Sequence, residues 1–179
     1  MFFNNNGPTI LIPGENTPWL NNPDVVVGVG SAYKSTAGNV YNLATYGEIP
    51  VGKVAIMEGI VGVNPINNTT RTIVFGFRNN FNAPTAYLTY PRNTYAVDHF
   101  GFYIQGTGLS AIWLTPGGSL GTVAVGDKLA IKVTGFLFEF FKNDILIHSR
   151  TANDGVTLYP SMLFYTYGAM TNVKTTIFN

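Results

Sequence analysis

Residues 126–149 read GDKLAIKVTGFLFEFFKNDILIHS and contain the pattern of three short strands. Apolar and polar residues alternate from Lys128 to Val133, which is the period of a β-strand with one face buried. Thr134-Gly135 is typical of a two-residue turn, and Asn143-Asp144 is typical of a second one. We therefore predict two consecutive β-hairpins in this segment.

The middle strand of this segment carries apolar residues on both of its sides. Strand periodicity puts two sets of residues on opposite faces, with Phe136, Phe138 and Phe140 on one and Leu137, Glu139 and Phe141 on the other. We predict that both faces are covered by other parts of the molecule. We expect the glutamate, Glu139, to pair with Lys132 or with another cation across the predicted hairpin.

The rest of the chain also consists of short alternating segments separated by turn residues, which leaves little room for helices. Twenty glycines and ten prolines are spread along 179 residues. Further strands are predicted around Val54–Ile56, Ile73–Phe77, Phe100–Ile104, Ser161–Tyr167 and Val173–Phe178. Many short strands at regular spacing predict an all-β, antiparallel two-sheet sandwich over residues 41–179. The Asn- and Pro-rich residues 1–40 are predicted to form an irregular N-terminal arm or cap.

Composition excludes several classes of function. Charged residues make up 11% of the chain against about 25% in an average domain, and the net charge is +1. No positive field is available to attract phosphate groups, so nucleic acid is not expected as a partner. The apolar runs fall far short of the roughly 20 residues that span a bilayer, and the N-terminus lacks the pattern of a signal peptide. We expect no membrane partner.

Catalytic and metal-binding motifs are scarce, and we predict no catalytic residues, no metal and no cofactor. The chain has no cysteine. His99 and His148 each fall inside a predicted strand, where a structural role is the simpler interpretation. Neither the paired carboxylates of a glycosidase nor a serine nucleophile elbow is found, although Glu58 and Glu139 are the residues to test for such an activity. A single loop-bound calcium ion stays an open alternative.

The best candidate for a binding site is a cluster of tyrosines and polar residues in residues 79–98. Aromatic rings can stack on the apolar face of a sugar, while amide and guanidinium groups bind its hydroxyls. The alternative is that these rings pack the edge of the sandwich. Trp19 is a further aromatic candidate, with anchoring of the arm as its alternative role. The predicted ligand-binding residues are Tyr87, Tyr90, Arg92, Asn93, Tyr95 and Trp113.

The C-terminal half resembles the concanavalin A-like β-sandwich superfamily, which includes legume-lectin-type, laminin G-like and SPRY domains. The resemblance runs from His99 to Phe178 and rests on the Gly-Asp, strand, tight turn, aromatic strand, Lys-Asn, strand order of residues 126–149. Asp144 stands where the family usually has glycine. The turn is expected to survive this change, because aspartate tolerates a positive φ better than most residues.

The resemblance implies a non-enzymatic recognition module that binds a glycan or a protein surface. Domains of this type commonly resemble modules of phage tails, capsids and bacterial surface proteins, so the resemblance implies a virion or cell-surface location. A second hypothesis is a structural subunit of a virion or appendage, in which low charge and the N-terminal arm favour a homo-oligomer or larger assembly. The third hypothesis is a polysaccharide-active enzyme.

Overall fold

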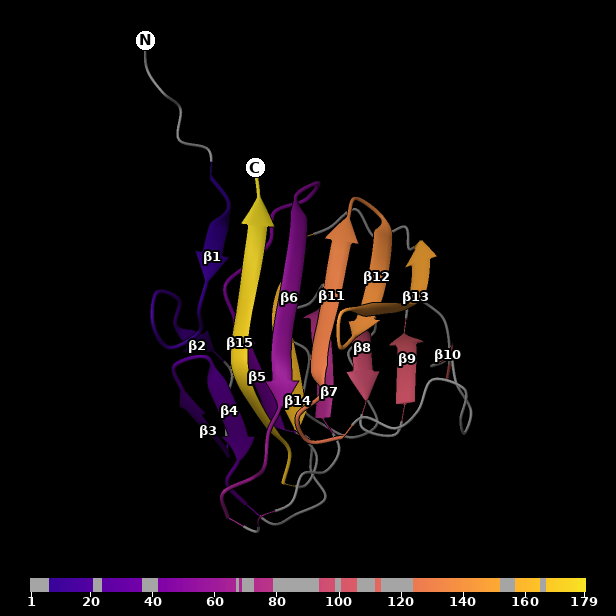
Figure 1. Ribbon diagram of the computed structural model, residues 1–179. Coiled ribbons are helices and arrows are strands. Elements are labelled where there is room, and N and C mark those ends of the chain that lie inside the picture. Colours follow the sequence, from indigo (N-terminus) through magenta and orange to yellow (C-terminus); the bar gives the residue numbers. More distant parts are fainter. Residues whose placement is uncertain are drawn as a thin grey trace.

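The computed structural model describes residues 7–20, 24–36, 42–66, 68, 73–78, 94–98, 101–105, 112–113, 124–151, 157–164 and 167–179. Every regular element within these ranges is a β-strand. The strands form two antiparallel sheets that lie one behind the other (Figure 1). The predicted all-β, two-sheet sandwich is therefore confirmed.

The sheet nearer the viewer in Figure 1, the front sheet, has the strand order β13-β12-β11-β6-β15-β4-β3, with β1 paired to β15. The rear sheet has the order β10-β9-β8-β7-β14-β5-β2. The front strands are β1 (Thr9–Leu11), β3 (Val25–Gly28), β4 (Ser31–Lys34), β6 (Val54–Val61), β11 (Lys128–Thr134), β12 (Leu137–Lys142), β13 (Ile145–Thr151) and β15 (Ala169–Phe178). The rear strands are β2 (Trp19–Leu20), β5 (Asn42–Tyr46), β7 (Ile73–Arg78), β8 (Thr94–Asp98), β9 (Gly101–Gln105), β10 (Ile112–Trp113) and β14 (Tyr159–Phe164).

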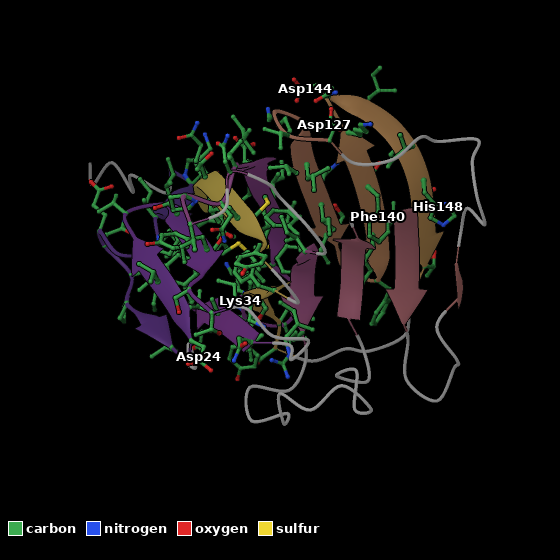
Figure 2. The ribbon with its side chains drawn as sticks, turned by 90° about the horizontal axis from the view of Figure 1, so that it is seen from below. Asp24, Lys34, Asp127, Phe140, Asp144 and His148 are labelled. Atoms are coloured by element: carbon green, nitrogen blue, oxygen red, sulfur yellow. The ribbon has the colours of Figure 1, made fainter. Side chains whose placement is uncertain are left out.

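The core lies between the sheets and is built from large side chains. Phe140 on β12 is completely buried between the two layers (Figure 2). The rings of Phe77 and Phe138 join the sheets with their centroids 6.5 Å apart. The hydroxyl of Tyr46 forms a hydrogen bond of 2.8 Å with the Thr175 hydroxyl of the opposite sheet. Burial raises the pKa of Tyr46, and this hydrogen bond lowers it by less, so the phenol stays protonated in the folded protein.

Both hairpins of residues 126–149 are present, and one turn is displaced by one residue. Asn143 and Asp144 connect β12 to β13 with φ angles of 50° and 65°, so aspartate does occupy the left-handed position that the family usually gives to glycine. The other turn consists of Gly135 and Phe136 rather than the predicted Thr134-Gly135. Gly135 has a φ of 58°, and glycine meets this requirement without strain.

This displaced turn changes the environment of β12. Phe136 lies in the turn with 47% of its surface exposed, and Leu137 is 37% exposed, so the outer face of β12 is not covered as predicted. The inner face carries the buried Phe138 and Phe140, as expected. The predicted cross-strand pair is confirmed, because Lys132 Nζ lies 3.0 Å from Glu139 Oε2.

The first 40 residues contribute more regular structure than the sequence predicts. Strands β1 to β4 lie in this segment and join both sheets. The assignment of residues 1–40 as an arm or cap stays a prediction. Trp19 on β2 anchors the segment, because its indole Nε1 donates to the Gly28 carbonyl at 2.9 Å and its ring meets Tyr46 edge-on at 5.4 Å. The proposed boundary after residue 40 falls outside the described residues.

Candidate functional site

The predicted tyrosine cluster is largely outside the part of the chain that the structure describes. Tyr95 lies in β8, where its backbone is in register with Phe77 of β7, and Trp113 lies in the short strand β10. The cluster therefore stays a prediction. Tyr87, Tyr90, Arg92 and Asn93 lie outside the described residues, as does His99.

A groove with a volume of about 490 Å³ lies on the outer face of the front sheet. Strands β6, β11 and β15 supply its floor and its polar groups. The loop after β1 and the turn between β3 and β4 supply its apolar side. The lining residues are Ile12, Val29, Gly30, Glu58, Gly59, Ile60, Lys128, Asn172, Val173 and Lys174. We take this groove as the candidate functional site.

The position of Glu58 follows from the alternation along β6. Met57 and Val61 are buried toward the rear sheet, whereas Glu58 and Ile60 are partly exposed on the outer face. Gly59 lies between them, and a Cβ added there would come within 2.9 Å of the Met170 side chain. The strand therefore presents a carboxylate and an isoleucine side by side in the floor of the groove.

An irregularity in β15 shapes the opposite wall. The register between β15 and β6 shifts between Thr171 and Lys174, and Asn172 within this bulge has a φ of 52°. The side chain of Asn172 is exposed at the groove and forms no hydrogen bond with any residue that the structure describes. Its amide is thus available to a ligand as both donor and acceptor.

Four charged side chains form a continuous chain across three strands and a turn. Lys174 Nζ lies 3.1 Å from Glu58 Oε1, and these residues are directly opposite each other in β15 and β6. Lys128 Nζ on β11 lies 4.0 Å from Glu58 Oε2 and 2.8 Å from Asp144 Oδ1. The hydrogen bond to Asp144 raises the pKa of Lys128, and burial opposes it only in part. The glutamate is therefore held between two ammonium groups.

The apolar side of the groove is fixed by backbone contacts. Gly30 donates its N–H to the Pro13 carbonyl at 2.7 Å, and its carbonyl accepts from Val173 N at 2.8 Å. These bonds hold the β3–β4 turn against β15, so Val29 and Ile12 stand beside the polar floor. Val29 is 62% exposed, which leaves an apolar surface for a ligand to cover.

The groups in this groove suit the binding of a ligand with both polar and apolar surfaces. The groove offers one carboxylate, one amide and two ammonium groups next to isoleucine and valine side chains. Glycoside hydrolysis generally uses two carboxylates on either side of the scissile bond, and Glu58 is the single carboxylate among the lining residues. Within the described ranges there is also no cluster of acidic and histidine side chains that could hold a metal ion.

Asp127 holds the turn between β12 and β13 against the start of β11. Its Oδ1 accepts from Asn143 Nδ2 at 2.9 Å, and its Oδ2 accepts from Ala124 N at 2.8 Å and contacts Lys142 Nζ at 3.0 Å. Burial alone would raise the pKa of Asp127, but these hydrogen bonds and the ammonium charge outweigh it and hold the pKa below its usual value. Asp127 and Asp144 lie together at one end of the sandwich (Figure 2).

A second polar cluster lies elsewhere in the sandwich and is closed to ligands. Lys34 on β4 is 1% exposed, and the Asn64 side chain donates to its backbone carbonyl at 2.9 Å. Burial lowers the pKa of Lys34, and the negative charge of Asp24 acts in the opposite direction (Figure 2). A side chain so deeply buried is part of the fold and not of a binding surface.

Sequence reasoning identified one residue of the groove, and for a different role. The sequence indicates Glu58 as a candidate catalytic carboxylate, and it gives no functional signal for Lys128, Asn172 or Lys174. The alternation of β6 is a signal that places Glu58 on an outer face. No comparable signal reveals the bulge at Asn172, because it depends on the register between two strands that are distant in sequence.

Solved structures with the same fold include binding domains and a proposed enzyme. The carbohydrate-binding module CBM66 from Bacillus subtilis is similar with a TM-score of 0.61 and 13% identity, over 91% of this chain and 96% of the module. Peanut lectin, solved with a nine-residue peptide, has a TM-score of 0.61 and 7% identity, over 97% and 98% of the two chains. A proposed glycosyl hydrolase from Parabacteroides distasonis has a TM-score of 0.53 and 9% identity, over 88% and 87%.

These likenesses show that the chain has the lectin-like, concanavalin A-type β-sandwich fold that the sequence predicts. No protein-family model and no curated protein matches the sequence. Among the described residues, no helix has the length and apolar character required to cross a membrane.

Proposed function

We propose that this lectin-like β-sandwich is a non-enzymatic recognition module that binds a glycan or a protein surface through the groove on its front sheet. The observation that carries the proposal is the combination, within one groove, of an ion-paired carboxylate, an amide with no hydrogen-bond partner among the described residues and an apolar wall. Hydroxyl-rich ligands require such mixed contacts, because their polar groups need hydrogen bonds while their C–H faces need apolar surface. The fold shared with a carbohydrate-binding module and a lectin supports the same function.

Replacing Glu58 by glutamine is expected to weaken ligand binding by about tenfold or more, which corresponds to the loss of one good charge-assisted hydrogen bond. The change keeps the shape of the side chain and removes its negative charge. A glycan array with the wild-type protein identifies a ligand, and isothermal titration calorimetry then compares the two proteins with that ligand.

The matched control is Glu139→Gln. Glu139 lies on the same face and is paired with Lys132 at 3.0 Å, and its side chain is 20% exposed against 25% for Glu58, but it does not line the groove. The control is expected to bind like the wild type. A well-folded protein that binds nothing on glycan arrays and captures no protein in pull-downs would contradict the proposed function.

The tyrosine cluster of residues 79–98 is a second proposed position for the same activity. A Tyr87→Ala, Tyr90→Ala double variant tests it directly. Loss of binding in this variant together with normal binding by Glu58→Gln would move the site from the groove to the cluster and leave the recognition function intact.

A structural role in an assembly is the second candidate function, and exposed apolar side chains favour it. Ile145 and Leu146, next to each other at the start of β13 in the β12–β13 hairpin, are 67% and 51% exposed. Exposed apolar side chains that gather in one region often mark contacts between proteins. We propose that copies of this chain or neighbouring subunits cover this hairpin, and the family resemblance supports a phage virion, tail or bacterial surface as the setting.

The assembly role predicts a particle larger than a monomer in light scattering at high protein concentration. An Ile145→Lys, Leu146→Lys double variant is expected to be monomeric, because two ammonium groups would be buried in the contact. Val51→Lys is the control, since Val51 is also 57% exposed but lies in the loop before β6. A wild-type protein that stays monomeric at all concentrations would exclude the assembly role for this hairpin.

The third hypothesis, a polysaccharide-active enzyme, has weaker support. It requires a second carboxylate near Glu58, and Asp144 is separated from Glu58 by Lys128, which contacts both. Release of reducing sugars from polysaccharides that is abolished by Glu58→Gln or Glu139→Gln would restore this hypothesis.

A further inference from the structure

The charges of the groove are balanced before any ligand binds. Lys174 is paired with Glu58 at 3.1 Å and Lys128 with Asp144 at 2.8 Å, while Glu58 also lies 4.0 Å from Lys128. Two ammonium groups are thus matched by two carboxylates. A ligand entering the groove meets polar groups without a net local charge.

The same groups keep free capacity for hydrogen bonds to hydroxyls. A carboxylate has about four lone-pair directions, and each oxygen of Glu58 has a single lysine neighbour. Each ammonium group has three donors, and the Asn172 amide adds donors and an acceptor with no protein partner among the described residues. Hydroxyls, which both donate and accept, can use all of these groups without displacing an ion pair.

A charged ligand would compete with the ion pairs that the protein has already formed. An anionic group would draw the ammonium of Lys174 away from Glu58, or that of Lys128 away from Asp144. The carboxylate would then lose its partner. A cationic group would compete with Lys128 and Lys174 for Glu58. The side chains of Glu58, Lys128 and Lys174 are 25–44% exposed, so a new ion pair returns little energy, while the charged ligand gives up the hydration of its own charge.

We propose that the groove selects uncharged saccharides and discriminates against uronic-acid-containing and amino-sugar-containing ones. This inference rests on the proposed recognition function and adds the class of ligand. The sugar hydroxyls contact the ion-paired side chains of Lys174, Glu58 and Lys128 and the Asn172 amide. A C–H face of the sugar covers the side chains of Val29, Ile12 and Ile60. Discrimination comes from the ion pairs that are already formed between protein side chains.

The test measures binding of neutral oligosaccharides of glucose, mannose, galactose, xylose and fructose, of oligogalacturonates and of chitosan oligomers by calorimetry. Each titration is run at about 10 mM and about 1 M NaCl, between which the Debye length falls from about 30 Å to about 3 Å. At least one neutral oligosaccharide is expected to bind, with a Kd that changes by less than about twofold between the two salt concentrations. The charged oligomers are expected to bind at least about tenfold more weakly.

Glu58→Gln is expected to reverse the preference. The variant groove has two ammonium groups and one carboxylate, so oligogalacturonates should bind more tightly than to the wild type and with a strong dependence on salt, while neutral ligands bind about tenfold more weakly. Glu139→Gln should change neither. Asn172→Gly is a second variant in case Glu58→Gln does not fold, because glycine accepts the φ of 52° and removes only the amide. The Asn172→Gly variant should bind neutral saccharides more weakly than the wild type and should still prefer them to charged saccharides.

The outcomes separate this inference from the recognition function. Tightest binding of oligogalacturonates or chitosan oligomers by the wild type, or an unchanged preference in a folded Glu58→Gln variant, would overturn the inference and leave recognition standing. Binding lost only in the Tyr87→Ala, Tyr90→Ala variant would do the same. If no saccharide bound and no protein were captured in pull-downs, both this inference and the recognition function would be overturned.

Discussion

Replacing Phe140 by alanine is expected to lower the free energy of unfolding by about 3–5 kcal/mol, the cost of deleting a fully buried aromatic ring. Phe140 is 0% exposed between the two sheets, where its ring lies 6.0 Å from that of His148 (Figure 2). The cavity is costly because the surrounding strands are tied into both sheets and relax little. Urea unfolding followed by circular dichroism measures the change.

The adjacent Phe141 provides the matched control. It carries the same ring on the same strand, but it is only partly buried and is paired with Ala130 and Leu146 rather than enclosed by the two sheets. Phe141→Ala is expected to cost less than half as much as Phe140→Ala. Equal losses would contradict the assignment of Phe140 to the core and Phe141 to the outer face.

The strand pattern of residues 126–149 was predictable because local alternation and turn chemistry agree there. Leu129, Ile131 and Val133 face the core as their period of two requires, and all three are at most 2% exposed. Asn143-Asp144 supplies the two residues that tolerate a positive φ. Where these signals coincide, the sequence alone specifies the strands and the face on which each of their residues lies.

The same signals are too weak in the first 40 residues. Strands β1 to β4 contain two to four residues each, which is too short for alternation to be recognised against Asn- and Pro-rich loops. Strands β1 and β2 have partners far away in sequence, since β1 pairs with β15 and β2 with β5, and the local β3–β4 hairpin joins the front sheet through β15. Tertiary pairing, rather than local preference, makes this segment regular.

The displaced turn has a related cause. Thr134-Gly135 and Gly135-Phe136 both contain the glycine that a two-residue turn needs, so turn chemistry alone does not choose between them. The structure selects the second, which keeps Thr134 in register with Leu137 and leaves Phe138 and Phe140 facing inward. The two registers differ by two residues, so Phe138 and Phe140 would face inward in both, and alternation does not choose between the turns either.

The groove depends on an even less local property. Its ion pairs use Glu58, Lys128 and Lys174, which are separated by 70 and 46 residues in sequence order. They meet because β6 lies between β11 and β15 in the front sheet. The order of strands in a sandwich cannot be read from alternation. A site assembled across such strands becomes visible only when the topology is known.

Replacing Asp127 by asparagine is expected to lower the free energy of unfolding at neutral pH by about 1.5–3 kcal/mol, the usual contribution of hydrogen bonds to a charged group. The carboxylate, 14% exposed, accepts from Ala124 N and Asn143 Nδ2 and contacts Lys142. Because the pKa of Asp127 is lowered in the folded state, its contribution is fully present above the unfolded pKa of about 3.9 and is lost as the pH falls through the lower folded pKa. The difference between wild type and variant should therefore shrink below about pH 4.

Asp144→Asn separates this clamp from a general effect of lost charge in the turn. Asp144 is bonded to Lys128 at 2.8 Å, but its side chain is 75% exposed, and surface ion pairs contribute little. Urea unfolding of the three proteins between about pH 7 and about pH 3 should show a pH-dependent loss for Asp127→Asn and nearly none for Asp144→Asn. Equal losses in the two variants would contradict this assignment. They would mean that the hydrogen bonds of Asp127 to Ala124 and Asn143 stabilise the hairpin no more than the exposed ion pair of Asp144 does.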